Sequence, residues 1–97
     1  MPDFSAPLAT ITSPADSAAV SKMAKIPVQA VDDTRLAQLD LLIDGILNRT
    51  TICSASLCEM QVPWNTRKVT VGRHTLTAIA YDGAGNEGVT EITVIVE

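Results

Sequence analysis

Apolar residues recur at every second position through most of this 97-residue chain, and this spacing constrains its fold more than any other feature. A period of two places alternate side chains on opposite faces of an extended strand, so that one face is buried and the other meets solvent. Threonine, valine and isoleucine, which favour strands, are plentiful in these runs. The pattern predicts seven strands, at residues 8–12, 23–31, 36–43, 46–52, 57–63, 73–81 and 89–96.

Short turn signals separate the strands. They are SPADS at 13–17, DDT at 32–34, DG at 44–45, CSAS at 53–56, NTRKVTVG at 65–72 and DGAGNEG at 82–88. Seven short strands without a helical stretch predict an all-β fold, a seven-stranded antiparallel β-sandwich of the immunoglobulin-like or fibronectin III-like kind. The sandwich is expected to occupy residues 7–97 as a single domain, after an N-terminal linker at 1–6.

One segment allows a different interpretation. Residues 33–47, DTRLAQLDLLIDGIL, also fit an amphipathic helix, because several leucines fall on one helical stripe. The strand interpretation is preferred, since a helix would place Asp44 and Gly45 in its interior. Pro27 and Pro63 cannot donate to a strand ladder, so their strands are expected at sheet edges or with bulges there.

The inward rows of the strands define a candidate core. Trp64 continues the row that contains Met60 and Val62, so we expect its ring to be packed in the interior rather than exposed for binding. The residues predicted to form the core are Trp64, Ile26, Val28, Leu39, Leu41, Leu76, Ile92 and Val94.

Charge and hydropathy exclude several classes of partner. Seven basic and eleven acidic residues give a net charge of -4, and no Lys/Arg cluster along the sequence forms a basic patch, so nucleic acid is not an expected partner. No apolar run approaches the roughly 20 residues that span a bilayer, so membrane insertion is not expected. The first ten residues lack the basic and apolar regions of a signal peptide.

The two cysteines, Cys53 and Cys58, lie five residues apart in CSASLC. Four intervening residues suit a short hairpin, which makes a local disulfide feasible and would place the protein outside the cytoplasm. Free thiols are the alternative. A zinc site is disfavoured, because His74 is the only histidine and a further ligand would still be needed.

The order of several short motifs resembles a known family. ATITSPADSAAVS, VQAVDD, LDLLIDG, VPWNT and GRHTLTAIAYDGAGNEG follow one another as in bacterial immunoglobulin-like domains, and the resemblance covers residues 7–96. It implies a sandwich without enzymatic activity that serves as a spacer, stabiliser or adhesion module beside other domains of a secreted or surface protein. Such a module would be extracellular, at the cell surface or in the periplasm. The segment RTTICSASLCEM departs from the family, which needs no cysteines.

Few residues point to catalysis. A nucleophile needs an adjacent base, and the single histidine, His74, is expected to be a packed strand residue held by a backbone partner. The adjacent carboxylates of Asp32 and Asp33 are expected to cap a solvated turn. Stacking on a sugar requires exposed rings, and the chain holds only Phe4, Trp64 and Tyr81. We therefore expect no enzyme.

Two loops could nevertheless bind something. In a sandwich of this topology, residues 32–34 and 82–88 lie at the same end, so the chain could bind a protein or a polysaccharide there. The same convergence would bring together the oxygen ligands of a possible calcium site, the one cofactor considered: Asp32, Asp33, Asp82 and Asn86. The simpler interpretation of AYDGAGNEG at 80–88 is a hairpin turn, since a phosphate loop would carry a lysine and open a helix.

Overall fold

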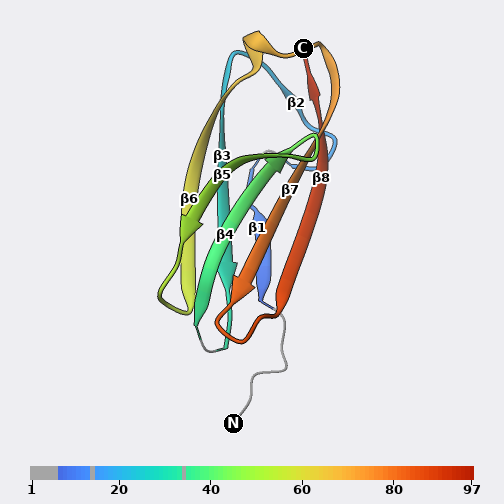
Figure 1. Cartoon of the computed structure of the whole chain (residues 1–97). Coiled ribbons are helices and arrows are strands. Elements are labelled where there is room, and N and C mark those ends of the chain that lie inside the picture. Colours follow the sequence, from blue (N-terminus) through green and yellow to red (C-terminus); the bar gives the residue numbers. More distant parts are fainter. Residues whose placement is uncertain (1–6, 14, 34) are drawn as a thin grey trace.

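A computed structural model describes residues 7–13, 15–33 and 35–97, and the predicted linker at 1–6 lies outside them. The described chain folds into two β-sheets that pack face to face (Figure 1). Its elements are β1 (Leu8–Ile11), β2 (Ala19–Val20), β3 (Met23–Val31), β4 (Leu36–Ile43), β5 (Ile46–Ile52), β6 (Leu57–Asn65), the 3-10 turn η1 (Thr66–Lys68), β7 (Gly72–Asp82) and β8 (Glu87–Val96). All seven predicted strands are present, and the helix considered for residues 33–47 is wrong.

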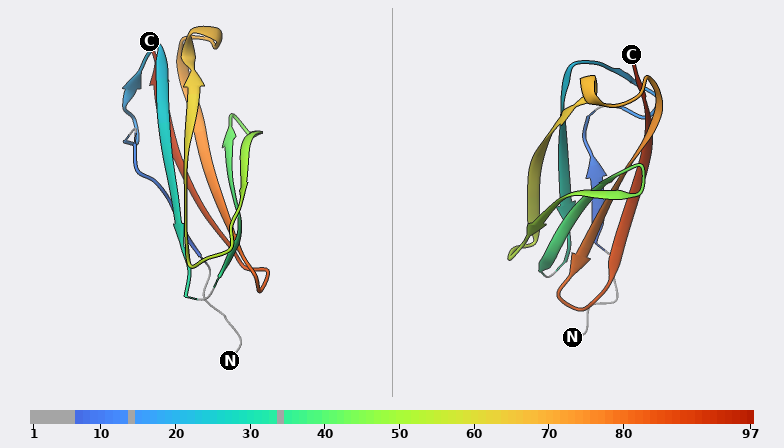
Figure 2. Two further views of the ribbon diagram at one scale, coloured as in Figure 1. Left: turned by 90° about the vertical axis from the view of Figure 1, so that its left-hand side faces the viewer. Right: turned by 45° about the horizontal axis from the view of Figure 1, so that its top comes forward.

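The sheets hold three and five strands. The smaller has the order β1-β3-β6, and the larger has the order β2-β8-β7-β4-β5, so the two layers of Figure 2 form an immunoglobulin-like sandwich. The short β2, which was not predicted, raises the strand count to eight, and it pairs with β8 in parallel rather than antiparallel fashion. The N-terminal segment thus contributes one strand to each sheet.

Apolar side chains at alternate positions of the strands fill the space between the two sheets, as predicted from the sequence. Ile26, Val28, Leu39, Leu41 and Leu76 are essentially inaccessible to solvent. Trp64 and Val94 are buried as well, whereas Ile92 is half-buried against the core. Burial of such side chains is worth about 1.5–3 kcal/mol each, which makes this core the main source of stability.

The hairpin between β4 and β5 follows from Asp44 and Gly45. Both have positive φ, 54° and 80°, as a two-residue type I′ turn requires, and this turn matches the twist of paired strands. The ladder shifts register between Leu41 and Leu42, which face Arg49 and Leu47, so the extra residue, Asn48, forms a bulge that bends β5.

The connection at 53–56 differs from the hairpin expected there. β5 belongs to the five-stranded sheet and β6 to the three-stranded sheet, so CSAS crosses between layers. Cys53 and Cys58 are joined by a disulfide with a Cα–Cα distance of 5.9 Å, and the bridge closes this crossover. The Cys53 N–H donates to the Ala37 carbonyl at 2.9 Å, which fixes the crossover against the start of β4.

The two prolines occupy different environments. Pro63 lies in β6, an edge strand, as expected. Pro27 lies in β3, the central strand of its sheet, so the expectation of an edge or a bulge is wrong for this residue. The Pro27 carbonyl accepts from the Thr12 N–H at 3.0 Å, just beyond the last β1 pair at Ile11. The missing N–H of Pro27 therefore falls where the β1–β3 ladder has already ended, and the ladder itself loses no bond.

The described chain enters and leaves the sandwich at opposite ends. Gly88, at the start of β8, lies so close to Pro7 that a Cβ on Gly88 would be 1.7 Å from the Pro7 carbonyl oxygen. Glu97 follows β8 at the other end, where its N–H donates to the Val20 carbonyl at 3.0 Å. Figure 1 shows these ends at the bottom and the top of the molecule.

Candidate functional site

The two loops proposed for binding lie side by side at the lower end of Figure 1. Leu36 pairs with Asp82 across β4 and β7, and the Gly83 N–H donates to the Arg35 carbonyl at 2.9 Å. The Asp32 N–H donates to the Ser56 carbonyl at 3.0 Å, which adds the crossover loop to the same end. The residues that follow the first loop, Arg35 and Leu36, thus contact the start of the second loop at Asp82 and Gly83.

The carboxylate of Asp82 organises the β7–β8 turn. One oxygen accepts from the N–H groups of Ala84 at 2.9 Å and Asn86 at 2.8 Å, and the other accepts from the Asn86 side-chain amide at 2.9 Å. The side chain is buried, so these bonds compensate its removal from water. AYDGAGNEG is a hairpin turn capped by its own aspartate.

The same bonds bear on the calcium hypothesis. Asp33 is exposed and Asp32 half-buried on the neighbouring loop, while Asp82 and Asn86 are engaged with each other. Among the residues that the structure describes, no three His, Cys, Asp or Glu side chains gather closely enough to hold a metal ion.

His74 is tied to the hairpin turn between β4 and β5. Its Nδ1 lies 2.6 Å from Asp44 Oδ2, and its Nε2 lies 2.7 Å from the Thr70 carbonyl oxygen. Both neighbours only accept hydrogen bonds, so both contacts are satisfied only when both ring nitrogens carry protons. Trp64 packs edge-on to the imidazole with ring centroids 5.7 Å apart. His74 is thus a packed strand residue with a backbone partner, as expected, and with an unforeseen carboxylate partner.

The protonation of this pair follows from its contacts. The hydrogen bond to Asp44 raises the pKa of His74 above its ordinary value of 6.5, the Thr70 carbonyl acts in the same direction, and burial opposes them. Burial tends to raise the pKa of Asp44, but the hydrogen bonds from His74 and the Thr75 N–H outweigh it and lower the pKa below 3.8. The pair forms an ion pair that fastens the β4–β5 turn to β7.

A second polar cluster covers the outer face of the five-stranded sheet. Asp40 is buried and accepts from the Gln38 amide at 2.9 Å and the Thr50 hydroxyl at 2.8 Å. Tyr81 lies beside it, where burial and the charges of Asp40 and Glu87 raise the pKa of the phenol above 10.0. This tyrosine is half-buried rather than presented for stacking.

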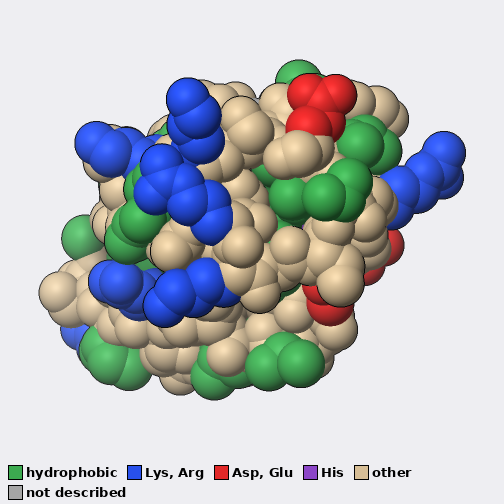
Figure 3. Space-filling view, turned by 90° about the horizontal axis from the view of Figure 1, so that it is seen from above, with side chains coloured by type: hydrophobic (Ala, Val, Ile, Leu, Met, Phe, Trp, Pro, Cys, Tyr) green, Lys and Arg blue, Asp and Glu red, His purple; other side chains and the backbone are tan. Residues whose placement is uncertain are grey.

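Basic side chains gather at the end opposite the two loops. Lys22, Lys25, Arg67 and Lys68 are exposed and come from the start of β3 and from η1. The Lys22 carbonyl accepts from the Thr66 N–H at 2.9 Å and hydroxyl at 2.6 Å, which holds the two segments together. Figure 3 shows Lys and Arg side chains grouped on one side of this end. The expectation of no basic patch is therefore wrong in three dimensions, because the segments lie about forty residues apart in sequence.

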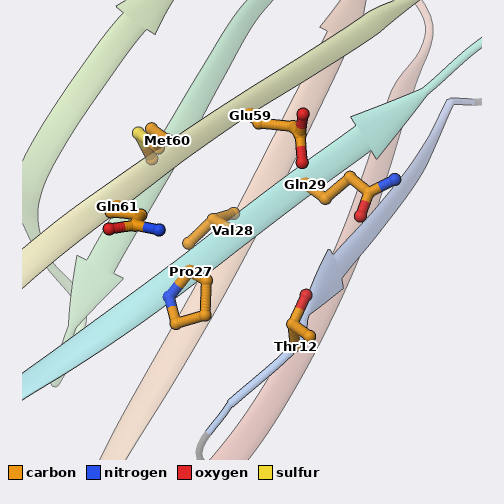
Figure 4. Close-up of a pocket in the computed structure, with 7 residues that line it drawn as sticks. All are labelled: Thr12, Pro27, Val28, Gln29, Glu59, Met60 and Gln61. Carbon is orange, nitrogen blue, oxygen red and sulfur yellow. The ribbon is translucent and has the colours of Figure 1, made fainter.

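A shallow hollow of about 300 Å³ lies on the three-stranded sheet (Figure 4). Its polar wall comes from cross-strand neighbours, with Gln29 opposite Glu59 and Gln61 opposite Pro27. Its volume is at the lower limit for ligand pockets, and no aromatic ring lines it. The lining residues are Thr12, Pro27, Val28, Gln29, Glu59, Met60 and Gln61.

Several of these features escaped sequence reasoning. The Asp44–His74 pair joins residues thirty positions apart, and the basic end joins β3 to η1. A signal for Asp40 was present, because an aspartate in the middle of LDLLID falls on the outward row and needs polar neighbours when covered.

No described helix could cross a membrane, since the described helical structure is confined to the three residues of η1.

Comparison with known proteins identifies relatives of this sandwich. A family model described as a bacterial Ig domain matches residues 7–78. The fibronectin(III)-like modules of CbhA from Clostridium thermocellum are 24% identical, with a TM-score of 0.70 over 95% of this chain and 47% of that one. The endo-beta-1,4-mannanase from Thermotoga petrophila is 12% identical, with a TM-score of 0.75 over 98% of this chain and 20% of that one.

A CARDB domain from Pyrococcus furiosus is also similar, at 15% identity and a TM-score of 0.61, with 94% of each chain covered. No curated protein sequence matches the chain. The chain spans about half of the CbhA fragment and a fifth of the mannanase, and at these identities the likeness shows the fold.

Proposed function

Because this chain belongs to the bacterial Ig domain family, we propose that it is a non-catalytic accessory module of a larger protein and holds its neighbouring domains at a fixed separation. The observation that carries the proposal is the position of the two chain ends. The described chain begins beside Gly88 and ends after β8, so a domain on each side would be attached at opposite ends of one sandwich.

The length of the separation follows from β8. Nine residue steps lead from Gly88 to Glu97, and a strand advances about 3.3 Å per residue, which gives about 30 Å. A flexible chain of about 90 residues has a mean end-to-end distance near 50 Å with a broad distribution. The sandwich would therefore fix a distance that a linker leaves variable.

Several contacts support the rigidity that a spacer needs. The disulfide closes the crossover between the sheets, the Asp44–His74 pair fastens the β4–β5 hairpin to β7, and Asp82 caps the β7–β8 turn. Each restrains a connection between strands that would otherwise be free to open. Together they hold three different connections of the sandwich in place.

The polar groups of the described chain support a role without chemistry. Both nitrogens of His74 face acceptors, so neither can accept a proton from a nucleophile in this arrangement. The hollow beside Gln29 has no histidine and no ring for sugar stacking, and Glu59 is its single ionisable lining residue. The covered carboxylate of Asp40 is used by its own neighbours.

The disulfide also supports a location for the module. Disulfides persist in oxidising compartments and are rare where thiols are kept reduced. A place outside the cytoplasm, in the periplasm, at the cell surface or beyond it, is the location that we infer. Residues 7–97 act as one unit in this proposal.

Replacement of the module within its parent chain tests the proposal. One variant carries an unrelated β-sandwich whose ends also lie at opposite poles, and the other carries a Gly/Ser linker of equal residue count. The unrelated sandwich should preserve the activity of the flanking domains, and the linker should reduce it. If both replacements abolish the activity equally, the module itself recognises something and the spacer proposal is wrong.

The alternative, ligand binding by the 32–34 and 82–88 loops with or without calcium, has its own test. The adjacency of the loops favours it, whereas the self-contained Asp82 turn disfavours a metal ion. Calcium at millimolar concentration should leave the thermal midpoint of unfolding unchanged. A rise in the midpoint that Asp33→Asn removes would favour the alternative.

A further inference from the structure

The two ends of the sandwich carry opposite charge. The basic end comprises Lys22, Lys25, Arg67 and Lys68. The acidic end comprises Asp32, Asp33 and Glu87, which lie on the loop before β4 and at the start of β8. A net charge of -4 for the whole chain conceals this separation.

The charges of the basic end are available to a partner. All four side chains are exposed, and the one ion pair in the described part of the chain is the Asp44–His74 pair. Three carboxylates lie toward the same end: Asp44 is paired with His74, Asp16 accepts from the Thr93 N–H, and Glu97 follows β8. With Asp44 paired, four basic side chains against two carboxylates leave an excess of positive charge. At the acidic end, Arg35 is the basic residue of the adjoining loop and leaves an excess of negative charge.

The direction of the chain relates these two ends. The described chain begins at the acidic end, beside Gly88, and finishes at the basic end, after β8. When one such module follows another, the basic end of the first therefore faces the acidic end of the second. Opposite surface potentials that meet in this way orient partners and disfavour the reversed arrangement.

We propose that the basic end docks onto the acidic end of a second copy of this module, so that successive modules stack head to tail. The inference rests on the proposed accessory role and adds a partner to it. The contact is heterologous, because two different surfaces meet, and it therefore extends into rows rather than closing into a dimer. Between linked modules it can be weak, since a short tether supplies an effective concentration of about 1 mM.

Charge exchange between two variants tests this contact directly. In Arg67→Glu/Lys68→Glu both ends are acidic, and in Asp33→Lys/Glu87→Lys both ends are basic; all four positions are exposed. Self-association is measured by analytical ultracentrifugation at about 1 mM protein, the effective concentration of a short tether. Arg49→Glu, on the exposed edge strand β5, is the control, because it changes the net charge of the chain at a position outside both ends.

The wild-type protein and Arg49→Glu should self-associate at low salt, and each end variant alone should not. An equimolar mixture of the two end variants should associate again. Raising the salt from about 0.1 M to about 1 M should abolish association, because the screening length falls from about 10 Å to about 3 Å. Carbodiimide cross-linking of isotopically labelled and unlabelled wild-type copies should join Lys22, Lys25 or Lys68 of one copy to Asp33 or Glu87 of another.

The opposite results would overturn the proposal. The first is that the end variants associate as the wild type does. The second is that their mixture associates no more than its components. The third is that the wild type stays monomeric and binds dextran sulfate instead, which would assign the basic end to polyanions. None of them bears on the spacer role, because the replacement experiment measures that role separately.

Discussion

Replacing Asp44 with asparagine removes the charge that faces His74 and leaves the hairpin turn intact. Asp44 has a φ of 54°, and asparagine tolerates this conformation as well as aspartate does. The asparagine oxygen can still accept from the Thr75 N–H, which donates to Asp44 at 2.9 Å in the native protein. The substitution therefore isolates the ion pair from the geometry of the turn.

The cost of the substitution is set by the loss of one charged hydrogen bond. Hydrogen bonds to charged groups contribute about 1.5–3 kcal/mol and neutral ones about 0.5–1.5 kcal/mol. The Asp44 side chain is 45% exposed, so solvent screening reduces the difference to about 1 kcal/mol near pH 5.5. The loss should be smaller at pH 9, because His74 loses its proton, and with it the charge that faces Asp44, as the pH rises.

The sign of the pH dependence follows from the two shifts. The pKa of His74 is raised in the folded state, so its contribution is complete below 6.5 and is lost as the pH rises through the higher folded value. The pKa of Asp44 is lowered, so its contribution is present above 3.8 and is lost as the pH falls through the lower folded value. The pair should therefore stabilise the wild-type protein most between these pH values.

Urea unfolding of both proteins at several pH values measures these effects, and NMR titration of the single histidine gives the pKa of His74 directly. The pKa should lie above 6.5 in the wild type and lower in Asp44→Asn. An equal cost of the substitution at pH 5.5 and pH 9, or a wild-type pKa below 6.5, would refute the ion pair.

Four further variants test the packing of the sandwich, each followed by urea unfolding. Trp64→Ala should cost about 3–5 kcal/mol, because the ring is buried between the sheets; a loss under about 1 kcal/mol would contradict that position. Gly88→Ala should cost about 1–3 kcal/mol, because a Cβ would overlap the backbone of Pro7. Gly83→Ala, in the β7–β8 turn, is the control and should be nearly neutral, because its Cβ would meet nothing closer than 3.7 Å. Equal effects of the two alanines would show that the close approach is absent. Replacing Cys53 and Cys58 together with alanine should cost about 2 kcal/mol through the closed loop, and an unchanged midpoint under reducing conditions would argue against the bridge.

Local patterns were sufficient to predict seven of the eight strands in the described chain. Alternation places Leu39, Leu41 and Leu76 inward because it depends only on neighbours two residues away. Pairing depends on the other sheet as well, so the crossover at 53–56 was taken for a hairpin, and Pro27 was expected at an edge although it lies in a central strand. The two-residue β2 is too short to produce a periodic signal.

The candidate sites were predicted less completely for the same reason. Asp82 could be assigned to its turn because its partners, Ala84 and Asn86, are within four residues. The Asp44–His74 pair and the basic end arise only when β4, β7, β3 and η1 are assembled. A count of charges along the chain cannot reveal such groupings, since it contains no information about which ends of the strands coincide.

The distance between the two ends of the sandwich tests the central proposal, that the module fixes a separation, most directly. Leu8→Cys and Glu97→Cys place spin labels at exposed positions near the two ends, and the native cysteines are unavailable because they form the disulfide. Pulsed electron–electron double resonance should give one narrow distribution near 30 Å, widened only by the label arms, as the rise along β8 requires. A broad distribution reaching about 50 Å, as for a flexible chain of this length, would contradict the account.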